Sequence, residues 1–81
     1  MMIYIVEDDK NIQEIESFAL KNSGYEVRGF EYAKDFYAAL DEQIPDLVLL
    51  DIMMPKLDGW QVCRDIRKKS NCPIIMITAK G

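Results

Sequence analysis

Four short apolar runs, spread along the chain, limit the folds available to this sequence more than any other feature. Three of them, residues 2–6, 46–51 and 74–78, are almost uninterrupted apolar stretches. Runs of this length and uniformity are typical of strands buried on both faces, as in parallel sheets. The fourth run, residues 25–30, alternates only weakly and predicts a short edge strand.

The segments between these runs carry apolar residues at helical spacing. The repeated positions are Ile12, Ile15, Phe18 and Ala19 in residues 10–23, Phe36, Ala39 and Leu40 in residues 32–42, and Val62, Cys63 and Ile66 in residues 60–69. Gly24 and Pro45 follow the first two segments and are typical helix stops. The order βαβαβαβ predicts an α/β fold with a parallel sheet, right-handed crossovers and helices on both faces.

The size and charge of the chain exclude several classes of protein. Its 81 residues provide one small domain or part of one, and 49% hydrophobic residues are enough for a globular core. A net charge of −4 argues against direct binding to nucleic acid or to anionic lipid. No apolar run approaches the roughly 20 residues of a membrane span, and the acidic start does not resemble a signal peptide. We therefore expect a cytoplasmic protein.

Two absences narrow the possible chemistry further. The chain contains no His, so Ser-His-Asp and Cys-His nucleophile systems cannot be built within it. Cys63 and Cys72 do not form a C-x-x-C pair, so we interpret them as ordinary thiols rather than as zinc ligands or a disulfide.

Acidic residues follow two of the predicted strands. Glu7, Asp8 and Asp9 come directly after the first strand, Asp51 ends the third, and Thr78 ends the fourth. In parallel α/β sheets, ligands bind at the carboxyl ends of the strands. Carboxylates that meet there repel each other unless a cation is present, and Mg²⁺ prefers such oxygen ligands. We predict a magnesium site at this edge.

The position of Asp51 suggests a reaction. A carboxylate beside a bound metal ion can attack an activated phosphoryl group and hold it as an acyl phosphate. Asp51 stands alone at its strand end before a turn, and the Thr78 hydroxyl could contact the new phosphoryl oxygens. For any single acid in such a place, a role as turn former or helix cap is the competing interpretation.

Four blocks of the sequence together resemble the receiver domain of bacterial two-component response regulators. They are Ile5-Val6-Glu7-Asp8-Asp9, Leu49-Leu50-Asp51-Ile52-Met53-Met54-Pro55, Asp58-Gly59 and Pro73-Ile74-Ile75-Met76-Ile77-Thr78-Ala79. They occur in the family's order through the whole chain. The resemblance implies a flavodoxin-like sheet of strand order 2-1-3-4.

The resemblance also implies a role for each site residue. Asp51 would accept a phosphoryl group from a sensor histidine kinase, so the domain is a phosphoacceptor rather than an enzyme. Asp8, Asp51 and the backbone carbonyl of Met53 would bind Mg²⁺, with Glu7 acting through a water molecule. Thr78 would be the switch hydroxyl, and Asp9 a helix cap rather than a ligand.

The family's fold continues beyond the block that contains Thr78, with a helix, a strand carrying a catalytic Lys, and a final helix. We therefore expect residues 1–81 to form a single truncated receiver domain without the catalytic Lys and with impaired signalling. Lys56 and Lys80 are expected to be ordinary surface lysines. The last strand, from Ile74 to Thr78, would lie exposed at an edge of the sheet, and we expect self-association through it.

Two other functions remain possible from the sequence. The chain could be a dimerisation or docking module that is not phosphorylated, built on half of a receiver fold. A metal-dependent phosphatase with an Asp nucleophile is disfavoured because such enzymes usually carry a second Asp two residues on, where this chain has Met53. A DNA-binding output domain is common in the family, but none is expected within these residues.

Overall fold

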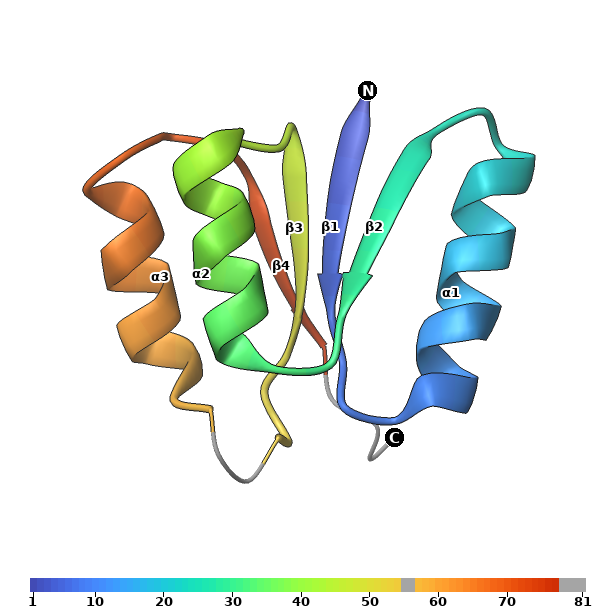
Figure 1. Cartoon of the computed structure of the whole chain (residues 1–81), viewed down its shortest axis with the longest axis horizontal. Coiled ribbons are helices and arrows are strands. Elements are labelled where there is room, and N and C mark those ends of the chain that lie inside the picture. Colours follow the sequence, from blue (N-terminus) through green and yellow to red (C-terminus); the bar gives the residue numbers. More distant parts are fainter. Residues whose placement is uncertain (55–56, 78–81) are drawn as a thin grey trace.

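The computed structural model describes residues 1–54 and 57–77. These residues form a four-stranded sheet with three helices (Figure 1). The elements in chain order are β1 (Met2–Val6), α1 (Lys10–Asn22), β2 (Glu26–Phe30), α2 (Ala33–Glu42), β3 (Leu47–Asp51), α3 (Gly59–Arg67) and β4 (Ile74–Ile77). The predicted element order is confirmed.

All neighbouring strands of the sheet are parallel, in the order β2-β1-β3-β4. Helix α1 covers one face, and α2 and α3 lie side by side on the other (Figure 1). The predicted flavodoxin-like arrangement, with its first four strands and three helices, is therefore confirmed. Thr78, which we assigned to the fourth strand, lies outside the described residues.

The main core lies between the sheet and the pair α2–α3. Tyr4, Phe30 and Phe36 pack edge to face, with ring centroids 5.1 to 6.3 Å apart. The Tyr4 hydroxyl donates a hydrogen bond to the carbonyl oxygen of Gln43 at 3.0 Å, so its polar end is satisfied inside the core. Aliphatic side chains complete this layer, namely Val6, Val48, Leu50, Val62 and Ile66.

Helix α1 begins as expected, and some of the apolar residues that predicted it lie on its exposed side. Asp9 is its N-cap and accepts hydrogen bonds from the backbone N–H groups of Asn11 and Ile12, so its predicted capping role is confirmed. The side chains of Ile15 and Phe18, however, are 69% and 68% exposed. Their helical spacing correctly predicted a helix, but it did not identify the side that faces the sheet.

The inward side of α1 is only half-buried and partly polar. It consists of Ile12, Gln13, Glu16, Ser17 and Leu20. The N-cap and a bond from the Gln13 side chain to the carbonyl oxygen of Glu7, at 3.0 Å, attach the first turns of the helix to the end of β1. These contacts hold the first turns of α1 against the carboxyl end of β1.

Helix α3 also begins at a side-chain cap. The Asp58 carboxylate accepts hydrogen bonds from the backbone N–H groups of Trp60 and Gln61. Residues Gly59, Val62 and Ile66 form the buried face of this helix. Within residues 1–54 and 57–77, no helix has the length and apolar character needed to cross a membrane.

Candidate functional site

Three carboxylates meet at the carboxyl edge of the sheet, the lower edge in Figure 1. Glu7, Asp8 and Asp51 each offer an oxygen atom, and these oxygens lie within 4.8 Å of one another. The register explains the meeting, because Val6 pairs with Leu50 and the residues that follow them therefore lie side by side. The structure thus brings together the three acids that the sequence placed at one edge; we call them the acidic cluster.

The members of the acidic cluster differ in burial. Glu7 and Asp51 are 3% and 4% exposed, whereas Asp8 is exposed. Glu7 is drawn into the sheet because its backbone N–H donates to the carbonyl oxygen of Phe30 at 3.0 Å, which extends the pairing of β1 with β2. The cluster therefore has a buried floor and one side open to solvent.

The Asp51 carboxylate is oriented by the loop that follows it. Its Oδ1 accepts a hydrogen bond from the backbone N–H of Met53 at 2.9 Å. The N–H of Ile52 donates to the carbonyl oxygen of Ile77 at 3.0 Å, so the chain stays attached to β4 as it leaves β3. These bonds bring the Met53 backbone to the acidic cluster, while its side chain is about half exposed.

Burial and like charge act strongly on Glu7. The pKa of Glu7 is raised to about 8, first of all by its loss of solvent. A hydrogen bond to the Asp51 side chain and the negative charges of Asp51, Asp8 and Glu16 raise it further. Its Oε2 is also buried with no hydrogen-bond partner among the described residues. An unsatisfied buried oxygen among crowded carboxylates is the environment that a hard divalent cation would relieve, and the donor set of oxygens suits Mg²⁺.

Glu16 is a fourth acid at this edge that the sequence analysis did not select. Burial and the charge of Asp51 raise the pKa of Glu16, and its Oε1 has no hydrogen-bond partner within the described part of the chain. It lies on the half-buried side of α1. Glu16 lies one helical turn after Ile12, whose backbone N–H donates to the Asp9 cap, so the two residues share one side of the helix. The sequence could have suggested Glu16 as a site residue only if the side of α1 that faces the sheet had been known.

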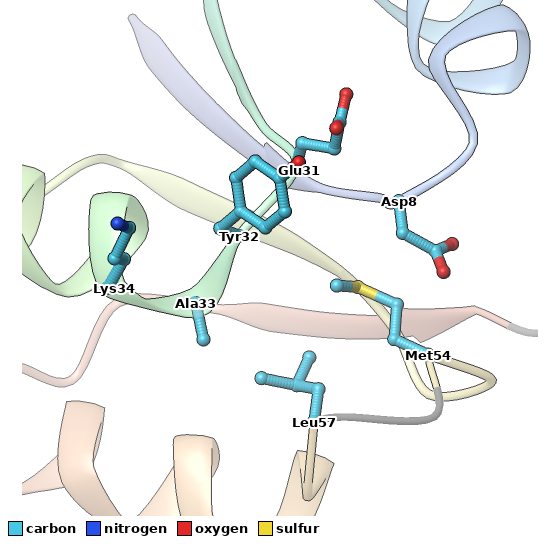
Figure 2. Close-up of a pocket in the computed structure, with 7 residues that line it drawn as sticks. All are labelled: Asp8, Glu31, Tyr32, Ala33, Lys34, Met54 and Leu57. Carbon is cyan, nitrogen blue, oxygen red and sulfur yellow. The ribbon is translucent and has the colours of Figure 1, made fainter.

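A cavity of about 410 Å³ opens beside the acidic cluster, and Asp8 belongs to both. Figure 2 shows its lining, in which the Tyr32 ring, Ala33, Met54 and Leu57 supply the apolar part. Glu31 and Lys34 complete the lining at its polar side. A partly apolar cavity therefore borders the acidic cluster at Asp8.

Three residues named from the sequence lie outside the described residues. They are the expected switch residue Thr78 and the lysines Lys56 and Lys80. The roles given to Thr78 and to the two lysines stay predictions.

Comparison with known proteins identifies the family. Residues 3–81 match the response regulator receiver domain. The BeF3-activated receiver domain of RstA from Klebsiella pneumoniae is 32% identical with a TM-score of 0.88, and the match covers 100% of this chain and 69% of that one. The response regulator TrrA of Thermotoga maritima, solved with Mg²⁺ and BeF, is 36% identical with a TM-score of 0.86, covering 99% and 70%.

TrrA also matches in a structure of its complex with the histidine kinase ThkA, with the same identity, TM-score and coverage. The matches thus span about two thirds of the length of each of these relatives. The fold and the strand order agree with the matched family. This chain belongs to the response regulator receiver domain family.

Proposed function

We propose that the chain is a phosphoacceptor whose Asp51 receives a phosphoryl group in a Mg²⁺-dependent reaction. The observation that carries this proposal is the meeting of Asp51 with Glu7 and Asp8, with their oxygens within 4.8 Å of one another. Carboxylates crowded in this way repel one another, and a bound cation would offset that repulsion. The structure of TrrA with Mg²⁺ and BeF and the BeF3-activated structure of RstA support the same chemistry here.

Asp8, Asp51 and the Met53 carbonyl would hold the Mg²⁺, with Glu7 acting through a water molecule. When bound, the ion supplies positive charge that offsets the charge of the carboxylates and of an incoming phosphoryl group. Burial of Glu7 beside Asp51 fits this role. Its Oε2, which has no hydrogen-bond partner among the described residues, needs a positive or hydrogen-bonding neighbour.

In the reaction, an Asp51 carboxylate oxygen attacks the phosphorus of a phosphohistidine. The new oxygen–phosphorus bond forms an acyl phosphate, and the phosphorus–nitrogen bond breaks with its electron pair going to the imidazole nitrogen, which takes up a proton. The N–H of Met53 holds one oxygen of Asp51, so the direction of the nucleophile is set before the donor arrives. Thr78 is proposed as the hydroxyl that contacts the phosphoryl group afterwards.

The proposed donor is a sensor histidine kinase. The complex of TrrA with ThkA supports a partner of this class. The partly apolar cavity beside Asp8 gives such a partner a surface next to the acidic cluster.

The test is to treat the chain with acetyl phosphate, or with beryllofluoride, in the presence of Mg²⁺. We expect one phosphoryl group to be gained, on Asp51, and the emission of Trp60, the only Trp, to change with beryllofluoride. Asp51→Asn should abolish both responses, and Asp35→Asn, an exposed acid in the first turn of α2, should leave them intact. No mass gain and no Mg²⁺ effect on the unsubstituted chain would refute the proposal.

A second candidate function, self-association without phosphorylation, is favoured by the exposure of β4. Ile75 is 47% exposed on this strand, which forms an edge of the sheet in the described part of the chain. An apolar edge strand can pair with a second copy. Sedimentation at micromolar concentration should then show dimers that Ile75→Lys disrupts and Asp51→Asn does not; a monomer would refute this candidate.

A further inference from the structure

The end of β1 is held by a glutamine side chain from α1 that the proposed reaction does not use. Nε2 of Gln13 donates a hydrogen bond to the backbone carbonyl oxygen of Glu7 at 3.0 Å. Gln13 is half-buried on the inward side of α1, a place where an amide side chain adds little to apolar packing. The position of this side chain therefore needs an explanation other than the core.

The side chain of Gln13 lies against a glycine of β2. A Cβ atom on Gly29 would lie 2.5 Å from Cδ of Gln13 and 2.9 Å from its Cγ, which is too close for real side chains. Among the described glycines only Gly24 has a positive φ, so Gly29 does not serve an unusual backbone conformation. A glycine inside a strand weakens that strand, and it often marks a close approach of another group. We therefore attribute Gly29 to the space that Gln13 occupies.

The hydrogen bond from Gln13 fixes a peptide unit next to the acidic cluster. The carbonyl of Glu7 and the N–H of Asp8 belong to one planar peptide unit, so holding one end sets the orientation of the other. The preceding peptide unit is held as well, because the N–H of Glu7 donates to the carbonyl oxygen of Phe30 at 3.0 Å. Asp8 is exposed, so the direction of its carboxylate depends on this backbone more than on packing around its side chain.

We propose that Gln13 is a positioning residue for the magnesium site and that Gly29 provides the space for it. Gln13 acts through the Glu7–Asp8 peptide unit, whose orientation keeps the Asp8 carboxylate close to that of Asp51. Groups that orient metal ligands from behind contribute strongly to metal affinity. The inference rests on the proposed function, because it takes Asp8 and Asp51 as ligands of Mg²⁺.

The first experiment measures the dissociation constant of Mg²⁺ by calorimetry on variants whose folding is checked by circular dichroism. Gln13→Met keeps the length of the side chain but has no N–H donor, and it should weaken Mg²⁺ binding about tenfold. Gly29→Ala should weaken it similarly, because the new methyl group displaces the Gln13 side chain. The control is Gln61→Ala, which removes an exposed amide side chain from α3 and should leave the affinity unchanged.

A double variant tests whether Gly29 acts through Gln13. Gln13→Ala removes the three atoms that a Cβ at Gly29 would meet most closely, so Gly29→Ala should have no further effect in that background. The double variant should therefore bind Mg²⁺ about tenfold more weakly than the unsubstituted chain, rather than about a hundredfold. A hundredfold loss would show that the two residues act independently, which would overturn the proposal.

A further measurement needs no metal and no substitution of Gly29. In EDTA, the NMR resonance of the Glu7 carbonyl carbon should move upfield in Gln13→Met, because a carbonyl that loses a hydrogen bond is less polarised. It should not move in Gln61→Ala. The proposal is overturned if this resonance does not move in Gln13→Met, or if that variant binds Mg²⁺ as tightly as the unsubstituted chain. Absence of Mg²⁺ binding by the unsubstituted chain would refute the proposed function itself, and this inference with it.

Discussion

Removing the charge of Asp51 should stabilise the metal-free protein, although the residue is buried and hydrogen-bonded. Asp51→Asn keeps the shape of the side chain and an oxygen that can accept the Met53 N–H. It removes one negative charge from a cluster whose oxygens lie within 4.8 Å of one another. At 4.8 Å, one pair of like charges costs about 0.9 kcal/mol in a water-like dielectric and about 3.5 kcal/mol at an effective dielectric of 20.

Asp8 is exposed, which places its repulsion with Asp51 toward the lower of these two values. We therefore expect Asp51→Asn to raise the free energy of unfolding by about 1 to 2 kcal/mol without Mg²⁺. With Mg²⁺ at ten times its dissociation constant, the unsubstituted chain should gain about 1.4 kcal/mol and the variant should gain nothing. Adding the metal would thus narrow the difference in free energy of unfolding between the two proteins, or reverse which of them is more stable.

Urea denaturation followed by circular dichroism measures the free energy of unfolding. It is carried out on the unsubstituted chain and on Asp51→Asn, each with EDTA and with Mg²⁺. Asp35→Asn is the matched control, since it removes a charge from an exposed first turn of α2 and should give no stabilisation. A metal-free Asp51→Asn variant less stable than the unsubstituted chain would show that repulsion does not dominate the cluster. A variant that still responds fully to Mg²⁺ would show that Asp51 is not needed for the metal.

Three further predictions concern the scaffold. Asp9→Ala removes both cap bonds of α1 and should lower the free energy of unfolding by about 1 kcal/mol in the same urea assay; an unchanged midpoint would contradict the capping role. Phe36→Ala leaves a cavity among the core aromatic rings and should cost about 3 to 5 kcal/mol, enough to unfold much of a chain this small, as seen in the loss of near-ultraviolet dichroism. Burial and a hydrogen bond to Asp65 raise the pKa of Tyr37 above its ordinary value of 10.0, so the folded state keeps this proton more tightly than the unfolded state. That stabilisation is complete below pH 10 and is lost as the pH rises further, so Tyr37→Phe should show a weaker fall in stability above pH 10; identical alkaline profiles would refute this.

Much of the fold could be predicted because its signals are local. The apolar composition of the runs that form β1 and β3 was enough to predict buried strands. Gly24 and Pro45 lie just beyond the first two helices, where they were expected to end them. The side of α1 that faces the sheet could not be predicted in this way. Ile15 and Phe18 are as apolar as core residues, yet both lie on the exposed side of α1, whereas Gln13 on its half-buried side bonds to the end of β1. A hydrophobic repeat predicts a helix but not the orientation of that helix on its sheet.

The candidate site, like the fold, could be predicted from the sequence only in part. The sequence alone placed Glu7 and Asp8 after the first strand and Asp51 at the end of the third, and a parallel sheet puts the carboxyl ends of its strands at one edge. The structure showed that these two strands are neighbours. Only the tertiary structure decided that Glu7 is buried against Asp51, that Glu16 adds its charge from α1, and that Trp60 remains outside the core. The physical reason is that the succession of strands and helices follows from local apolar patterns, whereas burial and charge interactions depend on how whole elements rotate and pack against one another.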